Sequence, residues 1–292
     1  MTKIWIRADD FGMTRESCQR IVQCIDNGLV NGVSILPNGC LSYGAELLKG
    51  RNLKLSVHLN FVEGRGLCRL EEIPLLVNKN GRMSHSFFGL LMLSCSPKRK
   101  ELETQICREA KAQIREVCSR FQSESITGLD SHQHTHMIPA VYKGVMRAVG
   151  ETGMDAAYLR VPAEPVMPFL KEPSLYMTYS PVNVVKQAVL NLLWNVLRKD
   201  IEKRHMQHPV FCGILFSGFM DKERVLKVLP RFKKIAEKRN CDLELLFHPG
   251  YIQRGEEVMD PLKTSFNSFY YSEGRKIEYH TLMQLKDCKI YE

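Results

Sequence analysis

Short apolar runs alternate with longer segments of helical periodicity along the whole chain. Runs with the length and composition of strands are expected at residues 3–8, 33–36, 54–59, 126–130, 157–161, 210–215, 243–247 and 288–291. Such alternation is typical of βα units around a parallel sheet, and the strands are numerous enough to close a barrel. The pattern therefore predicts an α/β fold built on a parallel sheet.

Capping residues and prolines mark the ends of the expected helices. Thr14 is a suitable N-cap for a first helix that ends at Gly28, and Pro139 stands in the first turn of a helix that ends at 150–153. Other helices are expected to end near residues 50 and 121 and to cover residues 182–204, 222–239 and 272–285. The stretch after residue 59, up to about 97, and the proline-rich loop 162–181 are expected to be irregular. The apolar face of helix 182–204 suits either a lid or the core, and we expect the core.

Length and composition describe an ordinary globular protein. The 292 residues are 44% hydrophobic and 25% charged, which fits a single domain over residues 1–292. The most apolar windows, 89–95 and 187–197, are shorter than the roughly 20 residues that span a bilayer, so we expect no transmembrane helix. The N-terminal residues have the pattern of a strand, and we expect no secretory signal there. The ten cysteines form no Cys-x-x-Cys pair, so we expect reduced thiols in a cytoplasmic protein.

The formal net charge of +9 raises the question of an acidic partner. Basic residues gather at 98–100 and along 222–239, which on their own would suit a nucleic acid or an anionic membrane. Apolar residues recur near helical spacing from Val225 to Ile235, so the second group reads as the solvent face of an amphipathic helix. We therefore expect neither nucleic acid nor a membrane as partner.

Residues that bind metals or transfer protons gather where the expected strands end. These residues are Asp9, Asp10, His58, Asp130, His132, Arg160 and His248. The carboxyl ends of barrel strands form the face on which βα-barrel enzymes build their active sites. The sequence therefore predicts one site on that face.

A divalent metal is the first chemistry that this group suggests. One carboxylate and two imidazoles, as in Asp10, His58 and His132, leave positions open for water and substrate, which is typical of a catalytic metal site. The three histidines of the run from Asp130 to His136 are spaced by two, so in an extended segment they would face one side. The alternatives are a histidine-rich surface loop and, for His58, an ordinary strand residue.

The remaining polar residues suggest a hydrolase. Asp9 is a candidate general base for the attacking water, and Arg160 a candidate partner that keeps Asp9 ionised. A histidine across the site would protonate the leaving group, and Asp130 is a candidate partner for a ligating histidine rather than a ligand. This set suits hydrolysis of an amide or an ester and leaves the substrate open.

The same residues lie in stretches that resemble the YdjC-like carbohydrate deacetylases, whose characterised members include chitooligosaccharide deacetylases. The matching stretches run in the family's order over about 250 residues: 8–12 (ADDFG), 31–38 (NGVSILPN), 58–64 (HLNFVEG), 130–136 (DSHQHTH), 159–162 (LRVP) and 248–251 (HPGY). The resemblance implies one distorted, TIM-like (βα) barrel that uses one divalent metal to remove an acetyl group from an N-acetylated sugar.

The resemblance also assigns roles to individual residues. Asp10, His58 and His132 match the metal ligands, Asp9 matches the base, and His248 resembles the general acid. The family is described with Mg²⁺, whereas two imidazole ligands by themselves favour Zn²⁺ or another transition ion.

Substrate contacts are expected within and around these motifs. Asn60, His134, His136 and Tyr251 are the expected substrate-binding residues. The aromatic rings of Phe61, Phe87, Phe88 and Tyr251 are candidates for stacking on a sugar, with core packing as the alternative. The unmatched segments 65–97 and 162–181 are expected to shape the sugar pocket.

Two rival functions remain open at this point. A phosphoesterase on the same barrel would need more phosphate-binding donors, since Arg160 is the one arginine in the matched motifs. A catalytically silent protein that binds a glycan or an acidic polymer is the other, although the aspartates and histidines are intact. We expect a small carbohydrate as partner, and a homodimer is compatible with the sequence.

Overall fold

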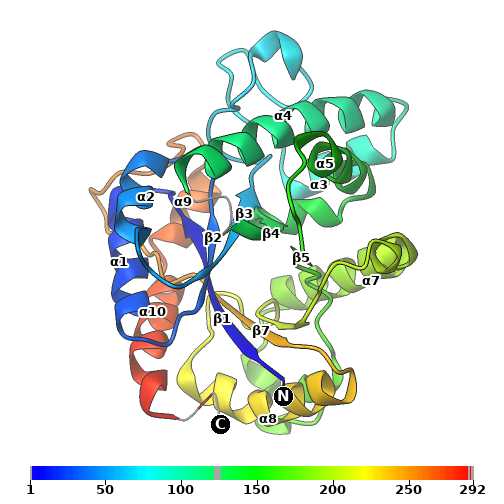
Figure 1. Ribbon diagram of the computed structural model, residues 1–292. Coiled ribbons are helices and arrows are strands. Elements are labelled where there is room, and N and C mark those ends of the chain that lie inside the picture. The colour runs from blue at the N-terminus through cyan, green and yellow to red at the C-terminus, as the bar shows by residue number, and fades with distance from the viewer. Residues whose placement is uncertain (1, 122–125, 289, 291–292) are drawn as a thin grey trace.

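Seven parallel strands form one curled sheet in the computed structural model, which describes residues 2–121, 126–288 and 290 (Figure 1). The strands are β1 (Ile4–Phe11), β2 (Gly32–Ile35), β3 (Lys54–Leu59), β4 (Ile126–Ser131), β5 (Tyr158–Leu159), β6 (Val210–Cys212) and β7 (Leu243–Phe247). Their order is β5-β4-β3-β2-β1-β7-β6, and all neighbours pair in parallel. The predicted α/β class and the parallel sheet are confirmed.

The sheet is open and curled, so the complete TIM-like barrel is not confirmed. Its two edges, β5 and β6, are only two and three residues long. A single bridge links Tyr158 to Gln207, and the Leu159 amide donates to the Gln207 carbonyl over 3.0 Å. Strands this short cannot sustain a continuous ladder across the gap. Of the strand expected at 288–291, Cys288 ends a 3₁₀ turn instead, and residues 289 and 291 lie outside the described part.

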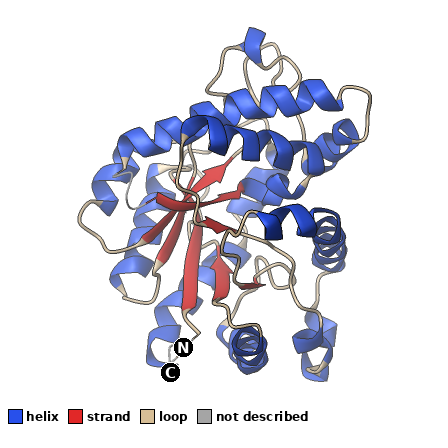
Figure 2. Ribbon diagram, turned by 45° about the vertical axis from the view of Figure 1, so that its right-hand side comes forward, coloured by secondary structure: helices blue, strands red, loops and turns tan. Residues whose placement is uncertain are grey.

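Helices cover the outer side of the sheet (Figure 2). They are α1 (Arg15–Asp26), α2 (Leu41–Leu48), α3 (Phe87–Ser94), α4 (Arg99–Arg120), α5 (Pro139–Thr152), α6 (Met167–Leu170), α7 (Pro181–Lys203), α8 (Lys222–Lys238), α9 (Thr264–Tyr270) and α10 (Glu273–Leu285). Short 3₁₀ turns are η1 (Leu70–Glu72), η3 (His132–Met137), η4 (Pro173–Thr178) and η5 (Lys286–Cys288). Helix α3 corrects the expectation that the stretch up to 97 is irregular: apolar residues at nearly every position hide its helical period.

The expected helix ends are present. Thr14 Oγ1 accepts from the Ser17 amide over 3.2 Å, and Ser17 Oγ accepts from the Thr14 amide over 3.1 Å, which forms a reciprocal capping box. Pro139 opens α5, and Gly153 ends it with a φ of +68°. A left-handed φ of this kind favours glycine at the end of a helix.

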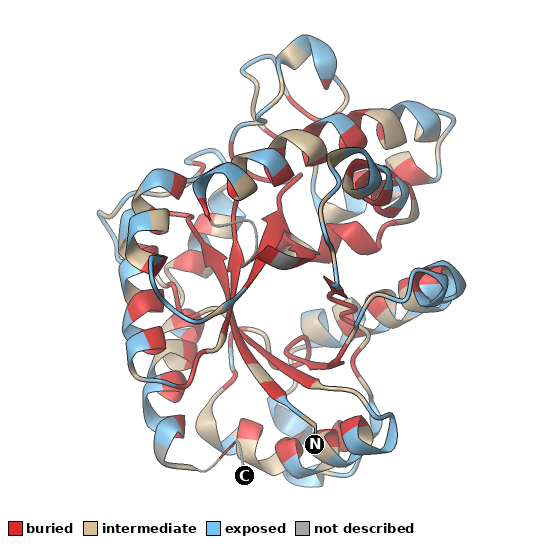
Figure 3. Cartoon of the chain, viewed as in Figure 1, coloured by how far each residue is buried: buried red, intermediate tan, exposed pale blue. Residues whose placement is uncertain are grey.

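The strands are buried on both faces, but what they bury differs (Figure 3). Apolar residues pack between the sheet and the helices. Inside the curl lie buried polar side chains, including Arg7, Ser34, Ser56, Arg160 and Glu244. Buried charges persist only where they are paired, so this interior holds a network of ion pairs and hydrogen bonds beneath the site.

The two long helices near the C-terminal half carry their apolar residues differently. In α8, Val225, Val228, Leu229 and Phe232 are buried, which confirms the amphipathic helix. In α7 the residues Leu190, Leu193, Leu197 and Ile201 are buried, but Val182, Val185, Leu192 and Val196 are exposed. The expectation that the apolar face of this helix belongs to the core therefore holds for one side of the helix only.

No helix in the described part of the chain is both long enough and apolar enough to cross a membrane.

Candidate functional site

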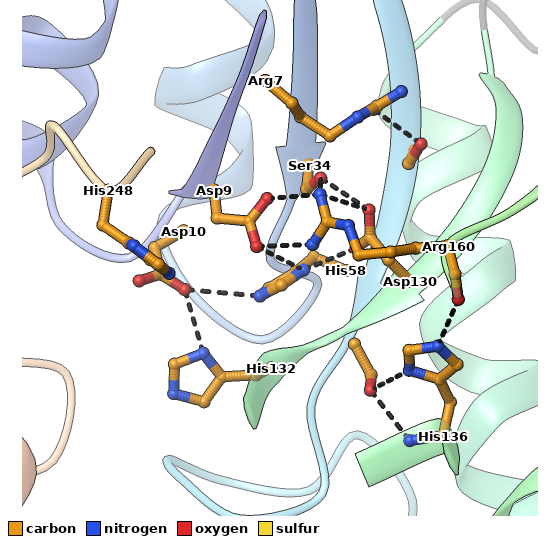
Figure 4. Close-up of polar contacts among 12 residues, drawn as sticks. Arg7, Asp9, Asp10, Ser34, His58, Asp130, His132, His136, Arg160 and His248 are labelled. Atoms are coloured by element: carbon orange, nitrogen blue, oxygen red, sulfur yellow. Dashed lines mark hydrogen bonds and ion pairs between the residues drawn. The ribbon is translucent and has the colours of Figure 1, made fainter. Parts of the chain in front are cut away.

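The polar residues expected at the strand ends come together at the carboxyl ends of β1, β3 and β4 (Figure 4). Asp9, Asp10, His58 and His132 are buried and line a cavity of about 620 Å³. Asp130 is fully buried behind them and does not line the cavity. The carboxyl-end face thus carries the candidate site, as the sequence predicted.

A bulge in β1 turns both adjacent aspartates towards the same side. Ala8 pairs with Val33 of β2 and Phe11 with Ile35, so three steps along β1 oppose two along β2. Asp10 takes up the extra residue with a left-handed φ of +64°. Neighbouring side chains of a regular strand point to opposite faces. Here the two carboxylates instead lie on either side of one imidazole, that of His58.

Three ligand atoms converge as a metal site requires. Asp10 Oδ1 lies 2.9 Å from His132 Nδ1 and 3.3 Å from His58 Nε2, and the three atoms lie within 4.8 Å of one another. Ligands held about 2.1 Å from one ion sit about 3.0–3.4 Å apart, so these separations fit a bound divalent ion. Asp10, His58 and His132 are therefore the residues that could hold a metal.

Arg275 of α10 prepares Asp10 for this role. Its Nη2 donates to Asp10 Oδ2, which leaves Oδ1 facing the two imidazoles. Burial opposes ionisation of Asp10, but Arg275 and His132 hold the pKa of this carboxyl well below its ordinary value. Asp10 is thus ionised at neutral pH, as a metal ligand requires.

A buried carboxylate orients His58. Asp130 Oδ1 pairs with His58 Nδ1 over 2.5 Å, and Asp130 Oδ2 accepts from Ser34 Oγ over 2.6 Å. Before an ion binds, burial lowers the pKa of His58, while Asp9 and Asp130 together raise it to about 10. A carboxylate behind a ligating imidazole fixes its orientation and increases its basicity.

A second group forms a less suitable set of ligands. Asp9, His58 and Asp130 also bring their ligand atoms within 4.8 Å. Both oxygens of Asp9 bind Arg160, however, and Asp130 lies away from the cavity. The cavity-facing group around Asp10 is the better candidate.

Arg160 clamps Asp9 from behind. Its Nη1 donates to Asp9 Oδ2 over 2.6 Å, its Nη2 to Asp9 Oδ1 over 2.8 Å, and its Nε to Glu244 Oε1 over 2.7 Å. Burial disfavours the guanidinium charge, but Asp130, Asp9 and Glu244 raise the pKa of Arg160 well above its ordinary value. Arg160 does not line the cavity, so it can position Asp9 without touching a substrate.

His248 enters the cavity from the end of β7. Its backbone amide donates to Glu278 Oε2, and its Nδ1 lies 3.3 Å from the same oxygen. Glu278 is fully buried and also accepts from the Gly218 amide over 2.6 Å. His248 Nε2 has no hydrogen-bond partner among the described residues, which leaves it available to a substrate.

Among the four expected substrate-binding residues, only His134 lines the cavity. Burial, Lys186 and Arg160 lower the pKa of His134 well below its ordinary value, so its ring is neutral. Its Nδ1 has no partner among the described residues.

The other three lie away from the cavity lining and have structural contacts. Asn60 Oδ1 accepts from the backbone amides of Val62 and Glu63, both over 3.1 Å, and so forms a turn. His136 uses both ring nitrogens, with Ser131 Oγ at 2.6 Å and the Arg160 carbonyl at 2.8 Å. The Tyr251 ring lies 4.2 Å below the guanidinium of Arg20.

The aromatic candidates divide in the same way. Phe61 is fully buried and belongs to the core, as its alternative interpretation held. Phe87 and Phe88 at the start of α3 line the cavity, and Phe88 is 59% exposed.

Four residues of the site escaped the sequence analysis. Glu63 Oε2 accepts from the Tyr270 hydroxyl and lies 3.4 Å from His132 Nε2. These two side chains therefore contact the ring nitrogen of His132 that faces away from Asp10. Arg275 and Glu278, described above, lie one turn apart in α10. They fall on the buried face of that helix with Thr281 and Leu285. Charged residues on an otherwise buried helical face were the signal in the sequence that could have identified them as site residues.

Known proteins resemble this chain over much of its length. A carbohydrate deacetylase of Mus musculus is 28% identical over 261 residues, which cover 85% of this chain and 78% of that protein. A chitooligosaccharide deacetylase of Yersinia enterocolitica is 26% identical over 224 residues, covering 73% of this chain and 85% of that protein. A carbohydrate deacetylase of Danio rerio is 29% identical over 173 residues; the chain spans about half of that relative, 52% of its length.

A solved structure shares the fold. The crystal structure of a proposed cellobiose-phosphate cleavage protein of Enterococcus faecalis superposes with a TM-score of 0.65 at 17% identity, over 99% of this chain and 93% of that one. The sequence model of the YdjC-like protein family matches residues 3–286, a range that contains every residue of the site. This chain therefore belongs to the YdjC-like protein family.

Proposed function

We propose that this protein is a metal-dependent hydrolase that removes the acetyl group from an N-acetylated sugar. The observation that carries the proposal is the pairing of two units in one cavity: the three-ligand group of Asp10, His58 and His132, and the carboxylate of Asp9 clamped by Arg160. The family and the names of its curated relatives, carbohydrate deacetylase and chitooligosaccharide deacetylase, support the same activity.

Asp10, His58 and His132 would hold one divalent ion. When bound, such an ion polarises the amide carbonyl and makes water a stronger acid. The family points to Mg²⁺, whereas two imidazole ligands suit Zn²⁺ or another transition ion better. Both ions are candidates under this proposal.

Asp9 would act as the general base. Its carboxylate takes a proton from the attacking water as the oxygen bonds to the acetyl carbonyl carbon. Arg160 fixes both oxygens of Asp9, and Glu244 fixes Arg160, so the base is oriented before substrate arrives. Each carboxylate oxygen keeps a second lone pair for the proton.

His248 would act as the general acid. As the C–N bond breaks, the leaving amine needs a proton, and His248 lines the same cavity as Asp9. Glu278 holds the Nδ1 side of the ring, so the proton would leave from Nε2. His134, also in the lining, would contact the sugar, while Asn60, His136 and Tyr251 would act through the loops that they stabilise.

The proposal extends to the setting of the enzyme. It assigns the activity to residues 1–292 as one domain in the cytosol, where free thiols stay reduced. The substrate is an N-acetylglucosamine oligosaccharide or a related glycan, and a homodimer is compatible with the activity.

Acetate release and metal content together test this function. Purified protein should hold about one divalent ion per chain and release acetate from N-acetylglucosamine oligomers. Asp9→Asn should keep the ion and lose acetate release, because it removes the base but no ligand. Unchanged acetate release by Asp9→Asn would rule out the proposed base, and absence of acetate release from every N-acetylated sugar would rule out the function.

A further inference from the structure

One wall of the cavity is mainly apolar, unlike the polar wall that carries the aspartates and histidines. Two helices, α3 and α7, form it, and both lie on the same side of the molecule in Figure 1. Their apolar residues in the lining are Phe87, Phe88, Val182, Val185, Val189 and Leu190. The catalytic aspartates and histidines face this wall across one continuous space.

Three of the apolar residues of the wall are exposed, while Phe87 and Val189 are partly buried and Leu190 is buried. Phe88 is 59% exposed, Val182 74% and Val185 56%. The stripe continues along α7 through Leu192 and Val196, which are 64% and 62% exposed. Positions 182, 185, 189, 192 and 196 follow helical spacing, and the stripe is about 21 Å long at 1.5 Å per residue. Contiguous exposed apolar residues of this kind usually mark a binding surface.

A sugar ring alone does not account for this wall. Each hydroxyl of a sugar needs a hydrogen-bond partner when water is removed, and valine and leucine side chains offer none. Phe87 and Phe88 offer flat rings for a sugar, but the aliphatic side chains of α7 lack such a face. A hydrocarbon chain, in contrast, loses only unfavourable contact with water when it covers such a stripe.

Polar groups of α7 mark where a sugar would meet the chain. Asn183 donates to the carbonyls of Leu215 and Ser217 over 3.2 and 3.0 Å, so it is already engaged. Lys186 lines the cavity among the valines, and its ammonium has no hydrogen-bond or ion-pair partner among the described residues. A polar group at the junction of the sugar and its aglycone would supply a hydrogen-bond partner for this ammonium.

We propose that the N-acetylated sugar is linked to an apolar, lipid-type chain that lies along the α3–α7 wall. This inference rests on the proposed deacetylase function and names its substrate class. The sugar enters the polar end of the cavity with its acetamide at Asp9 and Asp10, and the chain leaves past Val185 and Phe88 towards the stripe on α7.

A series of alkyl glycosides tests the inference. The metal-loaded full chain is given methyl, butyl and octyl β-glycosides of N-acetylglucosamine, each below its critical micelle concentration. Acetate release gives kcat/KM, and calorimetry gives Kd independently of turnover. Each buried methylene strengthens binding by up to about fourfold, so we expect kcat/KM to rise at least about tenfold from methyl to octyl. The increase in kcat/KM should come mainly from a lower KM, and Kd should decrease in parallel.

Paired variants on one helix locate the effect. Val182→Ser together with Val185→Ser should flatten the dependence on chain length, because both side chains line the cavity. Val184→Ser is the matched control: Val184 is 44% exposed on the same helix and does not line the cavity, so this variant should keep the dependence.

The possible outcomes separate this inference from the function on which it rests. Acetate release with equal kcat/KM for all three glycosides overturns the inference and leaves the deacetylase intact. Binding that strengthens with chain length but yields no acetate supports the apolar subsite and refutes deacetylation. If sedimentation shows a homodimer that the double Val→Ser variant dissociates, and Kd does not depend on chain length, the stripe is a subunit interface and the inference fails.

Discussion

The cavity has a strand wall, formed at the carboxyl ends of β1, β3 and β4, and a helical wall, formed by α3 and α7, and the two differ in how their side chains are satisfied. On the strand side, buried charged groups are paired with one another, as in the contacts of Asp9 with Arg160 and of Asp130 with His58. On the α3–α7 side, apolar residues such as Val182 and Val185 are 74% and 56% exposed, so the described residues leave most of their surface uncovered. The strand wall pairs its charged groups within the chain, whereas the helical wall would be covered only by the proposed apolar chain. Substitutions should therefore affect chemistry and stability on the first wall and substrate choice on the second.

The largest effect is expected at the candidate metal ligand on the strand wall. Asp10→Asn removes the anionic ligand, so we expect loss of the bound ion and a fall in kcat/KM of at least about a thousandfold. Mass-spectrometric metal analysis and an acetate assay measure the two effects. Asp155→Asn, at an exposed position, is the matched control. Retention of a stoichiometric ion by Asp10→Asn would show that the ligand assignment is wrong.

The next effect is on stability. Arg160→Met removes the guanidinium that the buried carboxylates of Asp9, Asp130 and Glu244 share, which should cost about 3–5 kcal/mol of unfolding free energy. Arg198→Met removes only the exposed pair with Glu202 and should change stability by less than about 1 kcal/mol. Denaturant titration compares the two variants. A small cost at Arg160 would mean that the strand wall is not held by its ion pairs.

A moderate effect is expected behind the proposed general acid. Glu278→Gln keeps the shape but weakens the hold on His248 Nδ1, so kcat should fall about 10–100-fold with KM nearly unchanged. The alkaline limb of the pH–rate profile, which follows loss of the proton from the general acid, should shift as well, and a purely structural role would not produce that shift. Glu273→Gln, on the exposed face of α10, serves as the control.

A pH dependence follows from His58. Its pKa is raised from 6.5 to about 10 before an ion binds, so the bound proton stabilises the metal-free fold fully below pH 6.5. This stabilisation is lost as the pH rises towards 10. An ion must displace the same proton, so metal affinity should increase by up to about tenfold per pH unit across this window. Calorimetric titration at several pH values tests it, and a flat affinity would contradict it.

The smallest effect is expected on the helical wall. Val196→Thr at its 62% exposed position should change unfolding free energy by less than about 0.5 kcal/mol. Val33→Thr is the same substitution at a fully buried position of β2 and should cost about 1–3 kcal/mol, because it buries a hydroxyl. Equal losses of unfolding free energy for the two variants in a denaturation experiment would contradict the contrast between the walls.

The sequence predicted the strand wall better than the helical wall for a physical reason. Strands β1, β3, β4 and β7 are rich in apolar residues, and their reactive residues lie at the carboxyl ends or directly after them, so the position of the site could be inferred from local pattern. Closure of the barrel depended on the lengths of β5 and β6, which the apolar runs 157–161 and 210–215 overestimated.

Long-range partners and apolar helices escaped the same reasoning. Arg275 bonds to Asp10 from 265 residues away, and no local pattern carries that information. Helix α3 has apolar residues all round, so it lacks the period that identifies an amphipathic helix. The exposure of Val182 and Val185 likewise depends on what the rest of the fold leaves uncovered.

The bulge in β1 has a consequence for how such a site could arise or be lost. One extra residue between Ala8 and Phe11 lets the neighbours Asp9 and Asp10 serve different partners, Arg160 and Arg275. Deleting Asp9 or Asp10 would restore an ordinary strand and leave one carboxylate where the site has two. The hydrophobic pattern of the chain would hardly change, so a one-codon deletion could leave a folded protein without its reaction.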